Sequence, residues 1–411
     1  MIQPRNKQAS AENVDLAVEA AVYGVTYFGH GAGRIMAVAV PLFLASLEPS
    51  AFLIGLAFGA RHLPSLFLSI ATGSLMDRFG TRQVLIFFSA IGIAVPLLYP
   101  AMPWVPLLIV LQMVLGFVTS LSWQGAQTLC GQLMGGSPKH AGRLAIVNQL
   151  GSLTCPLIVG AVWDYWGVWA SFLTMSLWEL AFLACCIALP KGGVATAGER
   201  APAKMTLGDL VPRLSDYVDA FKLMRIPAVA FVVVLSLLDH CAVGIHQSFY
   251  VVYLEGIHLS GTAIGALVST MSVGSVIGSM LVGPAAHWFN NNRLLLVSMT
   301  VSILAIALTP LLGGIYVLLL IAACVRGLFD GLAYPLIIVV MSRAVGRSDQ
   351  GKAVGVRTTG NRLVGTFVPV IMGLVAEGIG LGGSFLAVGT ALMMAMTAVG
   401  IWLYRTPALR G

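Results

Sequence analysis

Long apolar runs, separated by short polar stretches, extend along the chain from residue 17 to residue 404. An α-helix needs about 20 predominantly apolar residues to cross the hydrocarbon core of a bilayer. Twelve runs are long enough, and we predict a transmembrane helix in each of them. They cover residues 17–45, 51–76, 83–102, 105–134, 143–163, 168–189, 228–254, 262–286, 293–312, 315–342, 354–376 and 382–404.

The composition agrees with this pattern. Apolar residues make up 58% of the chain and charged residues only 9%. Soluble domains usually carry about 25% charged residues, so the excess apolar surface is expected to face lipid. The predicted fold class is therefore all-α and integral to the membrane, with the lipid bilayer as its surroundings.

Positive charge is distributed unevenly between the two sides of the predicted helices. Eighteen of the 23 Lys and Arg residues lie in polar stretches on one side, whereas opposite loops such as SLEPS and EGIGLGGS contain none. Because loops rich in Lys and Arg stay in the cytoplasm, both termini are predicted to be cytoplasmic and the number of spans to be even. The net charge of +7 is therefore explained by the basic residues of the predicted cytoplasmic loops. No nucleic-acid partner is expected, since one would need a basic patch on a soluble face.

The chain divides into two related halves. A polar linker rich in Pro, Gly and charge, residues 191–227, separates a predicted six-helix bundle at 1–190 from a second one at 228–411. Shifted by 213 positions, residues 139–173 match residues 352–386 at 12 of 35 positions. The matched pairs include Asn148/Asn361, Pro156/Pro369, Gly160/Gly373 and Gly167/Gly380, and Asp164 is aligned with Glu377. Parallel repeats of six helices are typical of secondary transporters, whose substrate site lies near the midplane between the repeats.

A loop motif lies between the second and third predicted helices. It consists of Gly73, Asp77, Arg78, Gly80 and Arg82, with Leu75 and Leu85 at the spacing G-x-L-x-D-R-x-G-x-R-x-x-L. The motif and its position resemble the signature loop of the major facilitator superfamily. The resemblance implies the fold of that family, with twelve transmembrane helices in two pseudo-symmetric six-helix bundles. It also implies that the loop holds the halves together while the cavity opens outward.

The family resemblance gives these residues expected roles. Asp77 is expected to face the positively charged N-terminus of the eleventh helix, near residues 352–357. Three positions depart from the family pattern: Thr81 replaces a basic residue, His287 stands where the second-half counterpart would carry Asp, and Gln112 occupies the place of a common Arg.

Five arginines lie inside apolar segments. Arg34, Arg61 and Arg326 fall near the predicted midplane, Arg362 lies about two turns inside its helix, and Arg357 is assigned to the inner mouth. A charged side chain at the bilayer centre costs about 2.5–3.5 kcal/mol on insertion scales, so such groups usually face a wet cavity or a partner. Arginine grips carboxylates and phosphates through a bidentate fork.

An anionic small-molecule substrate is therefore expected. The alternative is that the arginines cap carbonyls or pair internally for structural reasons. The residues expected to bind substrate are Arg34, Arg61, Arg326, Arg362, Asn148, Asn361, Tyr250 and Gln124.

Acidic groups and histidines in the spans could carry protons. Asp239 and His240 are adjacent in the seventh helix, and His30 occupies the repeat-equivalent place of His240 in the first helix. Asp330 is four residues after Arg326, so the two side chains can pair on one helix face. We expect Asp239, His240, His30 and Asp330 to take part in proton coupling, although each histidine could equally be a hydrogen-bonding group of the bundle.

These features together predict a secondary active transporter, with protons and a small organic anion as its partners. It is expected to be a monomer in the inner membrane of a bacterium, not an enzyme, and without a cofactor or a metal. The sequence has no nucleotide-binding loop for ATP. Proton-driven efflux of amphipathic drugs or metabolites is the alternative, and a channel or membrane sensor is a more remote one.

Overall fold

The structure is a computed structural model that describes residues 15–134, 138–190, 222–345 and 350–407. All regular secondary structure in these residues is helical, as predicted. The first half contains α2 (Leu16–Ser46), α3 (Ala51–Ala60), α4 (Leu63–Phe79), α5 (Thr81–Ala101), α6 (Val105–Leu133) and α7 (Pro138–Ala188). The second half contains η2 (Leu223–Arg225), α9 (Pro227–Ile245), η3 (His246–Tyr250), α10 (Val251–Gly256), α11 (Gly261–Trp288), α12 (Asn291–Ala307), η4 (Thr309–Leu312), α13 (Tyr316–Ala344) and α14 (Gln350–Arg405).

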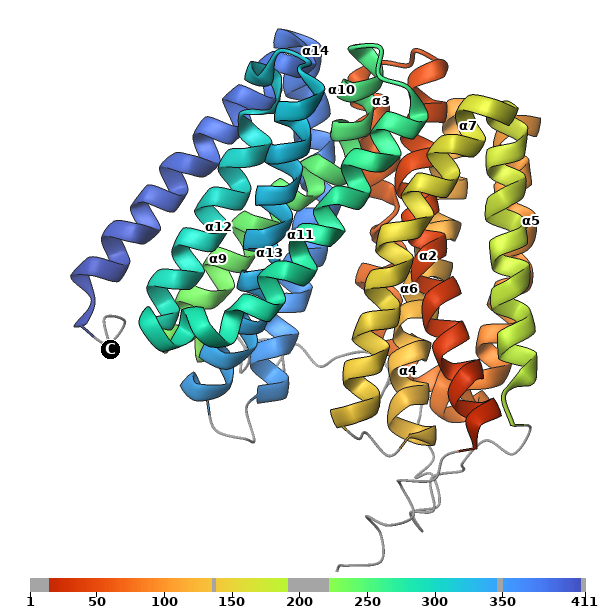
Figure 1. The fold of residues 1–411 in the computed structure, drawn as a ribbon, viewed down its shortest axis with the longest axis horizontal. Helices are drawn as coiled ribbons and strands as arrows, with labels where there is room; N and C mark the ends of the chain where they lie inside the picture. The colour runs from red at the N-terminus through yellow and green to blue at the C-terminus, as the bar shows by residue number, and fades with distance from the viewer. Residues whose placement is uncertain (1–14, 135–137, 191–221, 346–349, 408–411) are drawn as a thin grey trace, which may run out of the picture.

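Nine helical stretches in the described residues are long and apolar enough to cross a membrane. The two halves lie side by side, with α3 packed on α14 and α7 packed on α11 across the boundary (Figure 1). The first turn of α2 and the last turn of α14 lie at the same end of the molecule, which we call the terminal end (Figure 1). The opposite end is called the far end. Residues 191–221 of the predicted linker lie outside the described residues.

Helices α7 and α14 each turn back on themselves at a single glycine at the far end (Figure 1). Gly167 and Gly380 both have a backbone φ of 77°, in the region that side chains disfavour. The two glycines are also paired in the 213-residue sequence repeat. The repeated sequence therefore has the same backbone conformation in both halves, and each turn separates two antiparallel helical segments.

Two predicted spans are continuous apolar stretches whose helical geometry changes along their length. The span predicted at 51–76 breaks at Arg61 and His62, between α3 and α4. Pro64 stands in the first turn of α4, where its missing N–H costs no intrahelical hydrogen bond. The span predicted at 228–254 contains a π-helical turn, η3, between α9 and α10. Hydropathy does not distinguish these breaks from continuous helix, because the residues remain mostly apolar.

The halves approach one another backbone to backbone through glycines near the far end. A Cβ added to Gly55 of α3 would overlap the carbonyl of Pro369 in α14. A Cβ added to Gly265 of α11 would overlap the carbonyl of Pro156 in α7. Small residues let membrane helices approach backbone to backbone. These contacts therefore close the far end of the boundary between the halves.

Candidate functional site

A hydrogen-bonded cluster joins α2 to α7 inside the first half. The Arg34 Nε donates to the His30 Nε2 at 3.0 Å and to the Ser152 Oγ at 3.1 Å. The His30 Nε2 also lies 2.8 Å from the Ser152 Oγ. Arg34 and His30 are four residues apart, so one helix face presents both side chains. The cluster fixes Arg34 through one of its five N–H groups and leaves four for other acceptors.

The second half contains a matching arginine on α13. Arg326 is 4% exposed, and its Nη1 donates to the sulfur of Met271 at 3.3 Å. Its Nε lies 3.7 Å from the Asp330 Oδ2, which is an ion pair beyond hydrogen-bonding distance, and this nitrogen has no hydrogen-bond partner within the described residues. The other Asp330 oxygen accepts from the hydroxyl of Ser302. Arg326 is therefore buried and only partly satisfied.

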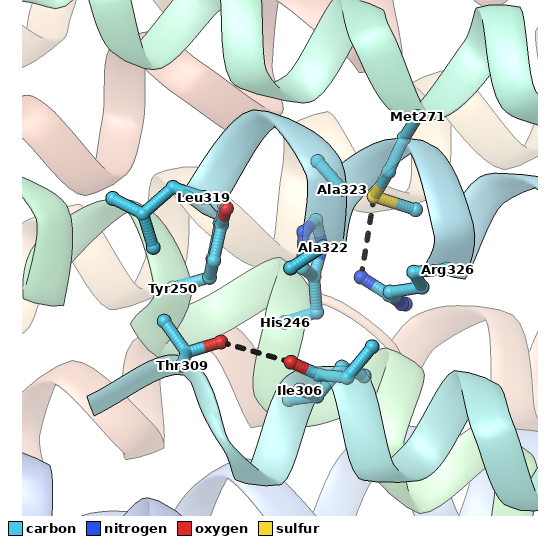
Figure 2. A pocket seen from close by; sticks show the side chains of 10 residues that line it. His246, Tyr250, Met271, Ile306, Thr309, Leu319, Ala322, Ala323 and Arg326 are labelled. Atoms are coloured by element: carbon cyan, nitrogen blue, oxygen red, sulfur yellow. Dashed lines mark hydrogen bonds between the residues drawn. The ribbon is translucent and has the colours of Figure 1, made fainter. Parts of the chain in front are cut away.

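A small cavity of about 10 Å³, enough for about one water molecule, lies beside Arg326. The π-helical turn η3 places His246 and Tyr250 in its wall, and their rings stack with centroids 4.3 Å apart. Figure 2 shows Arg326 and Met271 at one side of the pocket, with Tyr250 and Leu319 at the other. Single π-turns inside α-helices occur frequently at functional sites. This one provides the aromatic wall of the pocket.

The clusters of the two halves face one another. Arg34 and Arg326 interact electrostatically across the boundary, and His246 interacts with both guanidinium groups. Asp239 of α9 interacts with both Asp330 and Arg326. The structure thus brings together two arginines, two carboxylates and an aromatic pair from four helical elements.

Arg61 lies at the break between α3 and α4. A Cβ on Gly116 of α6 would overlap the Arg61 carbonyl, so α6 packs directly against the break. The Arg61 Nη2 lies 3.9 Å from the place of a Cβ on Gly33 in α2, and Arg61 interacts electrostatically with Arg34. Two like charges held together in this way create a local surplus of positive charge.

Several other expected site residues connect helices. Arg362 of α14 donates through Nη1 to the backbone carbonyl of Ser65 in α4. The Asn361 side-chain oxygen accepts from Ser236 at 3.4 Å. The Gln124 Oε1 accepts from Thr72 at 2.7 Å. Such contacts are the usual polar glue between membrane helices.

Asn148 and His240 stand apart from those three. The Asn148 Oδ1 is buried without a hydrogen-bond partner in the described part of the chain. His240 interacts electrostatically with Arg357 and with His62, which places it beside α14 and the α3–α4 break.

The loop motif is only partly described. Gly80 has a φ of 84° and ends α4, as a sharp turn requires. Arg82 donates to the carbonyls of Leu189 and Ile187, each at 3.0 Å, and so satisfies the end of α7. Arg78 is exposed beside the ring of Phe79. Gly73 lies within α4, but the side chain of Asp77 and its expected contact near residues 352–357 are outside the described residues.

Two carboxylates cross the boundary at the far end. Asp164 of α7 accepts from the backbone N–H groups of Gly261 and Thr262, both at 2.7 Å, and from the Thr262 hydroxyl at 2.6 Å. Its repeat counterpart, Glu377 of α14, accepts from the backbone N–H of Phe52 at 3.2 Å. Each carboxylate thereby caps the N-terminus of a helix in the other half, where negative charge is favourable. We call these the two carboxylate caps.

Ser152 and Met271 are site residues that the sequence does not reveal. Serine and methionine are common in membrane helices, and only the fold brings them to Arg34 and Arg326. A second group stays unexplained: the amide of Gln112 and both oxygens of Glu179 are buried without hydrogen-bond partners in the described residues. Within that same part of the chain, no cluster of three or more His, Cys, Asp or Glu could hold a metal ion.

Comparison with known proteins identifies one family and several solved structures of similar fold. The sequence profile of the Major Facilitator Superfamily matches residues 22–245 and 232–411. A variant of the nucleoside transporter NupG has a TM-score of 0.78 and 13% identity, covering 93% of this chain and 99% of that one. The D-xylose-proton symporter has a TM-score of 0.68 and 15% identity, over 94% and 97% of the two chains.

A peptide transporter POT variant in complex with sulfate is also similar, with a TM-score of 0.74 and 14% identity over 97% of this chain and 98% of that one. No curated protein sequence matches the chain significantly. At such low identities the structural likeness concerns the fold alone.

Proposed function

Because this chain belongs to the major facilitator superfamily, whose members are transporters, we propose that it moves a small organic anion across the membrane by alternating access, coupled to protons. The observation that carries the proposal is that Arg34 and Arg326 interact electrostatically from opposite halves, beside a pocket in the second half. A site that bridges the halves can be exposed first to one side of the membrane and then to the other as the halves rock.

The proposed topology has twelve spans in two six-helix bundles, residues 1–190 and 228–411, joined by the linker 191–227. It is supported by the turns at Gly167 and Gly380 and by the common position of the α2 and α14 ends (Figure 1). With the basic loops inside, the terminal end is cytoplasmic. A monomer in the bacterial inner membrane is part of the same proposal.

The proposal of an anionic substrate rests on charge. Arg61 interacts electrostatically with Arg34, and Arg34 interacts with Arg326 across the boundary. These three positive charges exceed the two negative charges of Asp239 and Asp330. The structural neighbours are named for a nucleoside, a sugar and peptides, and neither a nucleoside nor xylose carries a carboxylate. Because those neighbours share only the fold with this chain, their substrates do not determine its substrate class. The proposal is therefore based on the arginines of this chain.

Proton coupling follows from the surroundings of Arg326. Asp239 and Asp330 both interact with this one guanidinium. When both carboxylates are ionised, they compensate the charge of Arg326 and repel an incoming anion. A proton on either of them makes this group neutral, so that the positive charge of the nearby Arg34 can balance an anionic substrate, and the substrate and the proton are bound together.

The two carboxylate caps support a cycle that opens the two ends in turn. In this structure they hold α7 to α11 and α14 to α3 at the far end. Outward opening would have to break both caps and separate the glycine contacts beside them. The caps therefore favour the conformation in which the far end is closed.

The anion proposal is tested with Arg34→Gln and Arg61→Gln. Each change removes a charged donor for the substrate, and loss of a hydrogen bond to a charged group costs about 1.5–3 kcal/mol. We expect at least about tenfold weaker affinity for the accepted organic acid. Candidate acids are first selected by thermal shift on the purified protein, and counterflow in proteoliposomes then establishes carrier transport.

Arg343→Gln is the matched control, because Arg343 is an exposed residue in the last turn of α13. It should leave affinity unchanged. Normal affinity of both the Arg34 and the Arg61 variants for every accepted substrate would refute the anion proposal, and the absence of saturable counterflow would refute the carrier itself.

The carboxylate caps are tested with Asp164→Asn. Asparagine keeps one acceptor oxygen but loses the charge that favours the N-terminus of α11, an effect worth up to about 2 kcal/mol. We expect the population with an open far end to rise up to about thirtyfold. Spin labels at Tyr165 and Ile379, both exposed near the far-end turns of opposite halves, should then report a longer distance in a cysteine-free background.

Asp15→Asn makes the same chemical change at the N-cap of α2, at the terminal end. It should not change the distance between the labels. An unaltered distance distribution in the Asp164 variant would show that its carboxylate does not hold the far end closed.

A further inference from the structure

We propose that the terminal end of α12 and α14 binds an anionic phospholipid, with its phosphate on Arg293 and Arg405 and its acyl chains along the two helices. This inference goes beyond the proposed transport function, because it concerns how the protein meets the surrounding bilayer. It gives a role to two arginines that lie outside the central site and that take no part in the proposed transport cycle.

Arg293 and Arg405 belong to neighbouring helices that meet at the terminal end (Figure 1). Arg293 lies in the first turn of α12, and Arg405 is the last residue of α14. The guanidinium carbon of Arg293 is 5.6 Å from the ring centroid of Tyr404, the residue before Arg405. Both arginines are exposed. A single phosphate group beside Tyr404 is therefore within reach of both long side chains, and arginine binds phosphate through a bidentate fork.

The first half shows what an arginine in this place does when the protein supplies the acceptors. Arg82 lies in the first turn of α5, and Arg293 follows it by 211 residues at the same place in α12. Arg82 donates to the carbonyls of Leu189 and Ile187 at the end of α7. In the described residues no acceptor is hydrogen-bonded to the Arg293 guanidinium, which lies over the Tyr404 ring instead. Its N–H groups are available to an acceptor from outside the protein.

The charges around the two arginines favour an anionic headgroup. The acidic residues described in the second half lie in mid-helix or toward the far end: Asp239, Glu255, Asp330 and Glu377. Neither α12 nor residues 381–405 of α14 contain an Asp or Glu. The ammonium group of a zwitterionic headgroup would find no carboxylate among the described residues there, whereas a net negative headgroup is attracted by both arginines. The pattern favours phosphatidylglycerol over phosphatidylcholine.

The surface next to the arginines suits the rest of a phospholipid. Trp288 and Phe289, just before α12, are exposed, and exposed aromatic residues are typical of the headgroup level of a bilayer. A Cβ on Gly400 would lie 3.5 Å from the Leu296 side chain, so the two helices are in contact below that level. Exposed apolar residues continue along the helix faces of Arg293 and Tyr404: Val297 and Leu304 on α12, and Ile401 and Met394 on α14.

The experiment titrates short-chain phosphatidylglycerol and phosphatidylcholine onto the purified full-length protein in detergent and counts bound lipids by native mass spectrometry. We expect phosphatidylglycerol to bind at least about tenfold more tightly than phosphatidylcholine. Inorganic phosphate, which lacks acyl chains, should compete only weakly. Equal binding of the two lipids would overturn the inference, and so would full displacement of phosphatidylglycerol by phosphate at the same concentration.

Paired substitutions locate the site. Arg293→Gln combined with Arg405→Gln should weaken phosphatidylglycerol binding at least about tenfold. Arg225→Gln combined with Arg343→Gln is the matched control, because it removes two exposed charges from the same end of the second half, and it should leave the affinity unchanged. An equal loss in both pairs would show that the lipid responds to net charge alone and would overturn the inference.

A lysine pair covers the case in which the glutamine pair does not fold. Arg293→Lys combined with Arg405→Lys keeps both charges but loses the bidentate fork, so phosphatidylglycerol should bind severalfold more weakly. Unchanged binding in the lysine pair and in any folded glutamine pair would overturn the inference. None of these outcomes depends on the transported substrate.

Discussion

Asp239→Asn is expected to abolish proton-driven accumulation of substrate while leaving substrate exchange intact. Asparagine imitates the protonated carboxyl, so Asp330 alone balances Arg326 and the charge of Arg34 stays available for an anion. The carrier can then exchange substrate across the membrane but cannot release the proton that couples transport to the gradient. With one proton per substrate, a gradient of one pH unit supports about tenfold accumulation, and the variant should reach no accumulation.

The measurement compares two uptake modes in the same proteoliposomes. Accumulation is driven by an imposed pH gradient, and exchange is followed by counterflow without a gradient. Asp15→Asn, the same substitution at an exposed helix cap, should behave as the unaltered protein in both. Accumulation by the Asp239 variant at the normal ratio would exclude this residue as the proton carrier.

Two glycines of α11 should respond to alanine with opposite signs. A Cβ on Gly278 would overlap the backbone carbonyl of Leu328 in α13, whereas a Cβ on Gly283 meets nothing within 4 Å. Gly278→Ala must push the two helices apart, and we expect a loss of about 1–3 kcal/mol, as for other overpacked sites. Gly283→Ala should gain about 0.5–1 kcal/mol, because alanine favours the helix over glycine.

Thermal unfolding of the two purified variants in one detergent provides the comparison. The midpoint temperature should fall for Gly278→Ala and rise for Gly283→Ala. Equal shifts of the two midpoints would mean that α11 and α13 do not pack backbone to backbone at Gly278.

Helix positions could be predicted closely wherever apolar runs had clear polar ends. The predicted span 105–134 corresponds to α6 at Val105–Leu133, and the predicted span 315–342 corresponds to α13 at Tyr316–Ala344. The changes of helical geometry within two other runs, each of which is one apolar span, could not be predicted. An apolar sequence fits a regular helix and one with the turn at Arg61 or the π-turn at 246–250 equally well.

The candidate site could be predicted only within single helices. The spacing of Arg326 and Asp330 predicts their pairing, and the structure places them 3.7 Å apart. The same spacing relates His30 to Arg34, whose hydrogen bond could have been predicted in the same way. Contacts between different helices are not marked by any such spacing in the sequence. Arg362, which the sequence places with the other embedded arginines, instead donates to the carbonyl of Ser65, and its expected contact with substrate stays a prediction.

With the proposed topology, in which the far end faces outward, the single-glycine turns at Gly167 and Gly380 have a practical consequence for reagents that act from outside the cell. At these two places the helices reverse without a projecting segment, and proteases and inserted epitopes need an exposed, adaptable stretch of chain. An antibody directed there would meet rigid helix ends. Reporter tags for cell-surface labelling are therefore better placed in another connection of the far end, such as residues 47–50.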